Sequence, residues 1–180
     1  MRYDLFISGF GGQGVLLAGN LLAYAAINEG KNASFFPEYG VEKRGGSAMC
    51  TVVIADGEVG SPVIGNPSTV ILLNQLSMDK FQNKAKKNGL CIVNSSLIHN
   101  ISFSRDDLSV HKVPMNDIAM ELGDSRMANM VALGAYIASV PVVKAESLFE
   151  ALKDVLPERN HRFIPANIKA IEAGIAAVSS

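Results

Sequence analysis

Four glycines within six residues, Gly9 to Gly14, form the pattern of this sequence that could most directly do chemistry. Gly9, Gly11 and Gly14 match the spacing G-x-G-x-x-G that is typical of dinucleotide-binding turns, and Gly12 and Gln13 fill the gap between the last two. Such a turn exposes backbone N–H groups at the start of a helix, where they favour an anion such as a pyrophosphate. The same glycines would also let a helix cross a strand closely, so a ligand site and a packing role are about equally supported.

The acidic residue that an NAD-dependent enzyme needs is missing from its expected place. It should end the second strand and bind the ribose hydroxyls. Here that segment ends Phe35-Phe36-Pro37, and Glu38 comes only after the proline. Gln13 also places a large polar side chain inside the turn. The sequence therefore argues against a dehydrogenase, and a freestanding nucleotide-binding Rossmann protein is only an alternative.

A second glycine-rich segment, EYGVEKRGGSA, begins with Glu38 and Tyr39. Within it Arg44 stands directly before Gly45 and Gly46. A guanidinium beside bare backbone suits the phosphate or carboxylate of a ligand, or an acidic group of a protein partner. An ordinary solvated turn would look the same, and spacing alone favours that interpretation.

Other catalytic and metal-binding patterns are absent from the sequence. It contains no G-x-S-x-G, no Walker A motif and no paired carboxylates on one helix face. His99, His111 and His161 lie far apart. The only cysteines, Cys50 and Cys91, are too few for an iron–sulfur cluster and stand in apolar segments typical of buried, inert thiols. We therefore predict no catalytic residue and no metal ligand.

Composition limits the classes of partner. The 180 residues are 48% hydrophobic, which suits a single domain over residues 1–180. A net charge of −1 provides no basic field for nucleic acid or an anionic membrane. No apolar run is long enough for a membrane span and no signal peptide is evident, so the sequence predicts a cytoplasmic protein. The mean hydropathy of +0.22 favours a sheet buried on both faces or a surface covered by a partner.

Strand and helix patterns alternate along the chain. We expect a βαβ opening with strands at 3–8 and 33–36 around a helix that ends near Gly30. A strand at 48–54 should turn back at Asp56-Gly57 into a short strand at 58–60. Strands at 68–74 and 90–94 should flank a helix at 78–88. Four helices should follow, at 115–122, 126–140, 144–156 and 160–178. Asp124 or Ser125 should cap the helix at 126–140, and Pro165 should separate the first turn of the helix at 160–178 from the rest. These elements predict an α/β, Rossmann-like, doubly wound and mainly parallel sheet, with a β-hairpin insertion and a helical C-terminal layer.

Two motifs at this spacing, GFGGQGV after the first strand and PEYGVEKRGGSA after the second, carry a family resemblance. Over nearly its whole length the chain resembles the gamma subunit of 2-oxoacid:ferredoxin oxidoreductases. These multisubunit enzymes convert pyruvate, 2-oxoglutarate or branched-chain oxoacids to acyl-CoA. Members often carry an arginine in the strand after the RGG loop, where this chain has 50–54 CTVVI, so contacts of that arginine are not carried over. The beta subunit of indolepyruvate:ferredoxin oxidoreductase shares the glycine turn and is an alternative.

The resemblance implies a division of labour among subunits. Thiamine diphosphate would lie between the alpha and beta subunits, and the iron–sulfur clusters in other chains such as a ferredoxin-like delta subunit. Ferredoxin would accept the electrons. The gamma subunit would hold neither cofactor, but would shape the active site and assist coenzyme A. From its apolar composition alone, we also expect that the isolated chain could pair with itself through uncovered apolar faces. The implied binding residues are Gly9, Gly11, Gly12, Gln13, Gly14, Glu38, Tyr39, Arg44, Gly45, Gly46 and Asn129.

Overall fold

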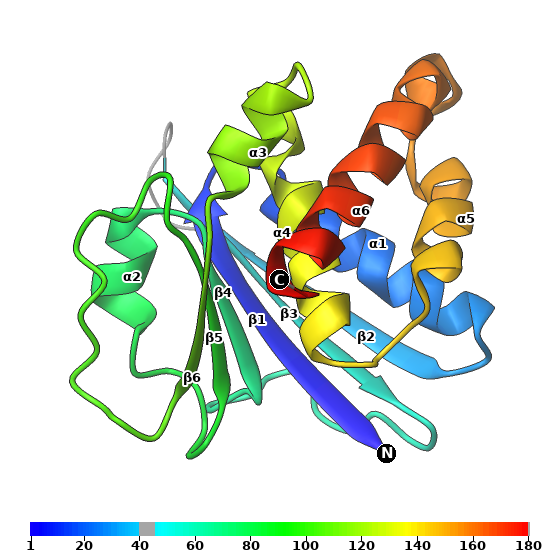
Figure 1. Cartoon of the computed structure of the whole chain (residues 1–180). Helices are drawn as coiled ribbons and strands as arrows, with labels where there is room; N and C mark the ends of the chain where they lie inside the picture. Colours follow the sequence, from blue (N-terminus) through cyan, green and yellow to red (C-terminus); the bar gives the residue numbers. More distant parts are fainter. Residues whose placement is uncertain (40–45, 180) are drawn as a thin grey trace.

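A computed structural model of the chain describes residues 1–39 and 46–179, which form one six-stranded sheet with helices on both faces (Figure 1). The strands are β1 (Arg2–Phe10), β2 (Asn32–Tyr39), β3 (Ser47–Ala55), β4 (Thr69–Leu72), β5 (Leu90–Asn94) and β6 (Ser109–Val113). The helices are α1 (Val15–Asn28), α2 (Gln75–Phe81), α3 (Met115–Glu121), α4 (Ala128–Ser139), α5 (Ala145–Val155) and α6 (Ile164–Ser179). Short 3-10 helices, η1 (Ser125–Met127) and η2 (Glu158–Phe163), precede α4 and α6.

The strand order is β2-β3-β1-β4-β5-β6. β1, β4, β5 and β6 are parallel neighbours, whereas β3 runs antiparallel to both β1 and β2. At the centre of the sheet, Ile7 of β1 lies between Cys50 of β3 and Ile71 of β4. The mainly parallel, doubly wound α/β fold predicted from the sequence is confirmed.

The position predicted for the hairpin is wrong. No strand forms at residues 58–60, and the antiparallel pair is instead β2 with β3, from Asn32 opposite Ala55 to Tyr39 opposite Ala48. The segment after β3 is held against the start of β1, since the backbone N–H of Asp56 donates to Met1 and Arg2 donates to the carbonyl of Val59. As a result β3 separates β1 from β2, so the strands of the expected βαβ unit are not neighbours.

Three further elements differ from the sequence-based expectation. β2 continues through Pro37 to Tyr39, so Glu38 lies within the second strand and not after it. α2 begins at Gln75 because Asn74 caps it, accepting from the backbone N–H of Ser77 at 2.9 Å, and it ends at Phe81 rather than at 88. β6 was not expected, since its five residues SVHKV are mixed in polarity and partly exposed at the sheet edge. The C-terminal helices lie as predicted. The split between η2 and α6 places Pro165 in the first turn of a separate helix, where its missing N–H costs nothing.

The hydrophobic core has two layers, one on each face of the sheet, and one layer contains more buried residues than the other (Figure 1). α1, α4, α5 and α6 cover one face of the sheet, where Cys50 is buried. α2 and the segment 96–108 cover the other face, where Cys91 is buried. Burial raises the pKa of each thiol to about 12, so both are inert at neutral pH as expected. Because the two thiols belong to opposite layers, they cannot ligate one cluster. Across the described residues, no helix is long and apolar enough to cross a membrane.

The carboxylate of Glu29 stabilises the start of α5 from a distant part of the chain. It accepts from the backbone N–H of Lys144 at 2.6 Å and from the hydroxyl of Ser147 at 2.7 Å. The ammonium of Lys31 lies 2.9 Å away. Burial alone would raise the pKa of Glu29, but these hydrogen bonds outweigh it and hold the pKa below 4.5. Glu29 therefore supplies the cap that Lys144, the residue at the N-cap of α5, does not provide.

We expect Glu29→Gln to lower the free energy of unfolding at pH 7 by about 1–2 kcal/mol, since charged hydrogen bonds are replaced by weaker neutral ones. Because the folded-state pKa is lowered, the contribution of the carboxylate is complete above 4.5 and is lost as the pH falls through the folded-state value. Urea unfolding at pH 7 and at about pH 3 measures both effects. A stability difference that does not shrink at the acidic pH would contradict this role for the charge.

Candidate functional site at the glycine turn

The glycine turn joins the end of β1 to the start of α1, as the sequence predicts. Gly12 and Gly14 have φ values of +98° and +73°, a region that suits glycine. Gly14 is the N-cap of α1, and no side chain caps this helix. The first N–H groups of α1 and the positive end of its dipole are therefore available to a ligand. An uncapped helix start of this kind suits an anion.

The turn lies at the topological switch point of the sheet. After β1 the chain crosses one face through α1 towards β2, and after β4 it crosses the other face through α2 towards β5, so the two neighbouring strands send the chain in opposite directions (Figure 1). Open α/β sheets bind ligands in the crevice outside the carboxyl ends of such strands. This topology favours a binding site around Gly12.

Gln13 links the two strands at the switch point. Its Oε1 accepts from the backbone N–H of Phe10 at 2.6 Å and from Nδ2 of Asn74, the N-cap residue of α2 just after β4, at 2.9 Å. The same oxygen lies 2.7 Å from the position of a Cβ at Gly9, and side-chain atoms of Val15 and Leu73 lie 3.0 and 3.2 Å from it, so this position is crowded. The side-chain oxygen of Gln13 thus points into the protein and holds the turn against β4.

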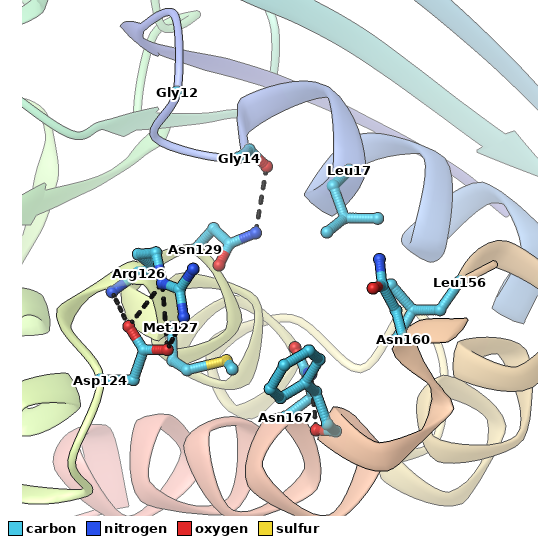
Figure 2. Close-up of a pocket in the computed structure, with 11 residues that line it drawn as sticks. Gly12, Gly14, Leu17, Asp124, Arg126, Met127, Asn129, Leu156, Asn160 and Asn167 are labelled. Carbon is cyan, nitrogen blue, oxygen red and sulfur yellow. Dashed lines mark hydrogen bonds and ion pairs between the residues drawn. The ribbon is translucent and has the colours of Figure 1, made fainter. Parts of the chain in front are cut away.

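Asn129 meets the glycine turn from the first turn of α4. Its side chain is only 3% exposed, and its Nδ2 donates to the carbonyl oxygen of Gly14 at 3.1 Å (Figure 2). The position of a Cβ at Gly14 would lie 2.3 Å from this nitrogen. The structure therefore brings together two predicted residues that stand 115 positions apart.

The other predicted residues are placed differently. The backbone N–H of Gly11 donates to the carbonyl of Gly46 at 2.9 Å, so the end of the second motif does touch the first. Glu38 and Tyr39 end β2 with exposed side chains and line neither of the cavities described next. Arg44 and Gly45 lie outside the described residues.

Two cavities meet at the turn. The larger, of about 300 Å³, is lined by Gly12, Gly14, Leu17, Asp124, Arg126, Met127, Asn129, Leu156, Asn160, Phe163 and Asn167 (Figure 2). The smaller, of about 190 Å³, lies over the ends of the parallel strands and is lined by Gly12, Gln13, Leu73, Asn94, Asn116, Ser125, Arg126 and Ala128. Gly12 and Arg126 line both. Polar groups and apolar walls together are typical of small-molecule sites.

Asn94 organises the floor of the smaller cavity. It is fully buried at the end of β5, and its Nδ2 donates to the carbonyl of Leu73 at 3.0 Å and to Oδ1 of Asn116 at 2.7 Å. Its Oδ1 accepts from the backbone N–H of Met115 at 3.1 Å, which fixes the start of α3. Every polar atom of this amide is thus used to join β4, β5 and α3 beneath the site.

Asp124 and Arg126 are lining residues that sequence reasoning did not identify. Asp124 was considered only as a helix cap, and it does accept from the backbone N–H of Arg126 at 3.0 Å. It also accepts from Nε and Nη2 of the same arginine, and these hydrogen bonds lower the pKa of Asp124 to about 2. Both groups are therefore charged at neutral pH. The only sequence signal for this pair was a helix-capping aspartate two residues before an arginine, a pattern that is common on protein surfaces.

A family model for pyruvate ferredoxin/flavodoxin oxidoreductases matches residues 4–177. The chain belongs to this family. The resemblance seen in the glycine turn and the RGG segment is thereby confirmed over nearly the whole length. Within the described residues, the structure groups no three His, Cys, Asp or Glu side chains that could hold a metal ion.

Relatives in the family are subunits of enzymes that act on several oxoacids. The chain is 34% identical over 160 residues to the 2-oxoglutarate synthase subunit KorC of Methanocaldococcus jannaschii, covering 88% of this chain and 86% of that subunit. It is 39% identical over 169 residues to the ketoisovalerate oxidoreductase subunit VorA of Methanothermobacter thermautotrophicus, covering 93% of this chain. This chain spans only 35% of the length of VorA.

A solved structure supports the same assignment. The gamma subunit of a keto/oxoacid ferredoxin oxidoreductase from Geobacter sulfurreducens PCA matches 99% of this chain and 97% of its own length, with a TM-score of 0.84 and 32% identity. The family and these relatives do not favour an indolepyruvate beta subunit or a freestanding Rossmann protein, the two alternatives that the sequence left open.

Proposed function

We propose that this chain is the gamma subunit of a 2-oxoacid:ferredoxin oxidoreductase. In that reaction the carboxylate carbon of the oxoacid leaves as CO₂, two electrons pass to ferredoxin, and the acyl group joins the sulfur of coenzyme A with loss of a proton. Thiamine diphosphate and the iron–sulfur clusters would belong to alpha, beta and ferredoxin-like delta subunits. The proposal retains the cytoplasmic location expected from the sequence.

The role proposed for this chain is to shape the active site and to contact coenzyme A. The observation that carries it is the uncapped glycine turn at the switch point, with a cavity on either side of Gly12. Backbone N–H groups at the start of α1 suit the phosphates of a coenzyme. Gly9, Gly11, Gly14 and Asn129 set the shape of this turn, and Gly46 adjoins it. Glu38, Tyr39, Arg44 and Gly45 are proposed to face the same ligand or a partner subunit.

Exposed apolar side chains around the site support a partner-covered surface. Tyr39 is 72% exposed at the end of β2, and Met120 is 65% exposed in α3. Leu76 and Leu97, which follow the ends of β4 and β5, are each 37% exposed. Tyr39 ends β2, and the other three follow the carboxyl ends of β4, β5 and β6. Exposed apolar side chains at this end of the sheet are available for contacts with a partner subunit.

Isolation of the tagged native chain from its own cells tests this function. We expect thiamine-binding and ferredoxin-like subunits to co-purify in a fixed ratio. The purified complex should reduce a viologen dye in an oxoacid-dependent manner, and this chain alone should not. Purification of the chain alone, as a monomer or homodimer, would count against the proposal. Dye reduction by the isolated chain would refute it.

A further inference from the structure

Arg126 occupies the point where the two cavities meet. No other lysine or arginine lines either cavity among the described residues. Its side chain is 78% exposed, so the guanidinium lies at the mouth of the cavities rather than in the protein interior. A ligand that spans both cavities must pass Arg126 and Gly12.

Asp124 holds the guanidinium in one orientation. Its carboxylate accepts from Nε at 2.9 Å and from Nη2 at 2.7 Å, a two-point contact with one edge of the guanidinium (Figure 2). Nη1 has no hydrogen-bond partner among the described residues. A planar guanidinium fixed along one edge can present its other donors to a phosphate with little loss of side-chain entropy. Asp124 is thus a positioning residue for Arg126.

The start of α1 adds to the positive potential at the larger cavity. Gly14 is the N-cap of α1, and no side chain caps this helix. Gly14 lines the cavity, so the positive end of the α1 dipole faces it. α4 and α6 instead continue directly from η1 and η2, and the backbone N–H groups of Ala128 and Ile164 donate to the carbonyls of Ser125 and His161. The open helix start at Gly14 favours an anion beside Arg126.

The inner part of the larger cavity suits an uncharged group that carries N–H donors. Asn129 and Asn167 are 3% and 5% exposed, and their Nδ2 atoms donate to the carbonyls of Gly14 and Phe163. This leaves each amide oxygen as an acceptor, and the oxygen of Asn129 points into the cavity (Figure 2). Apolar walls, including Leu17, surround these acceptors. Amide or heteroaromatic N–H groups would satisfy them.

We propose that Arg126, held by Asp124, binds a phosphate group of a nucleotide-type ligand, whose uncharged N–H-bearing part lies against Asn129 and Asn167. The inference deepens the proposed function and rests on it for the choice of coenzyme A as the natural ligand. On this basis Arg126 is a specificity-determining residue that selects the phosphorylated coenzyme over its phosphate-free pantetheine part.

Titration of the full chain with inorganic pyrophosphate, followed by backbone amide NMR shifts, tests the anion site without any partner subunit. We expect saturable shifts at Gly12, Gly14 and Arg126. Arg126→Gln should weaken the affinity by about 10-fold or more, because charge-assisted hydrogen bonds are lost. Arg159→Gln is the matched control, since it removes the same charge from an exposed residue of η2 that lines neither cavity. Absence of shifts, or equal affinities for wild type and Arg126→Gln, would overturn the proposal.

Titration of the complex that contains this chain tests selection of the ligand. Arg126→Gln should weaken binding of coenzyme A by at least about 10-fold and leave binding of pantetheine unchanged. Equal losses for both compounds would mean a general structural defect and would overturn the assignment. If pyrophosphate binds through Arg126 but no partner subunits co-purify, the anion site stands and the proposed function fails. If the subunits co-purify but pyrophosphate does not bind, only the further inference fails.

Discussion

Replacing Gly134 with alanine is expected to lower the free energy of unfolding by about 3 kcal/mol or more. α4 and α6 cross at two facing glycines. A Cβ at Gly134 would lie 2.0 Å from the carbonyl oxygen of Ile171, and a Cβ at Gly174 would lie 2.1 Å from that of Val131. Both contacts are with backbone atoms, so no side-chain rotation relieves them and the helices must move apart. In an uncrowded helix the same change would instead stabilise by about 1 kcal/mol.

Urea unfolding measures this effect, with Gly57→Ala as the matched control. Gly57 lies in the turn after β3, and a Cβ added there would meet nothing within 4 Å, so its substitution should change stability by less than about 0.5 kcal/mol. The double variant Gly134→Ala/Gly174→Ala should lose less than the sum of the single losses, because one separation of the helices relieves both clashes. Wild-type stability of Gly134→Ala would contradict the close crossing.

Features of the fold that depend on local sequence could be predicted. The glycine turn needs only a strand, glycines at fixed spacing and a following helix, and all three are adjacent in the chain. The hairpin could not be placed in the same way. Asp56-Gly57 is a strong local turn signal, but the pairing partner of β3 is decided by contacts of the sheet as a whole. β2 pairs with β3 along its full length, and Asp56 instead contacts Met1.

Prediction of the site was limited for the same reason. Asn129 could be named only through the family resemblance, since nothing in its neighbourhood shows that α4 brings it to Gly14. Asn160 and Asn167 come from η2 and α6, which have no motif, and reach the cavity only when α6 packs on α4. The inward hydrogen bond of Gln13 needs Asn74 from the end of the neighbouring strand. Chemistry that depends on residues from four separate segments leaves little local signal in the sequence.

Gly14→Ala is expected to lower the free energy of unfolding by about 3 kcal/mol, more than Gly12→Ala. Both residues have positive φ, so alanine is strained at either position by about 1 kcal/mol. At Gly12 a Cβ would meet nothing within 4 Å, whereas at Gly14 it would lie 2.3 Å from Nδ2 of Asn129. The amide of Asn129 must then move and lose its hydrogen bond to the carbonyl of Gly14. Because this leaves a buried polar group unpaired, it lowers the free energy of unfolding by about a further 1–3 kcal/mol.

A double-mutant cycle separates backbone strain from this clash. Asn129→Ala alone should cost about 1–2 kcal/mol, because the hydrogen bond to Gly14 is lost. In Gly14→Ala/Asn129→Ala the clash is absent, so the total loss should fall below the sum of the two single losses. Equal stabilities of the Gly12→Ala and Gly14→Ala variants, or simple additivity in the cycle, would mean that Asn129 does not hold the turn. A loss in the double variant that is smaller than the sum of the single losses would show that Asn129 and Gly14 interact directly. Because Asn129 belongs to α4, this result would mean that α4 fixes the shape of the glycine turn.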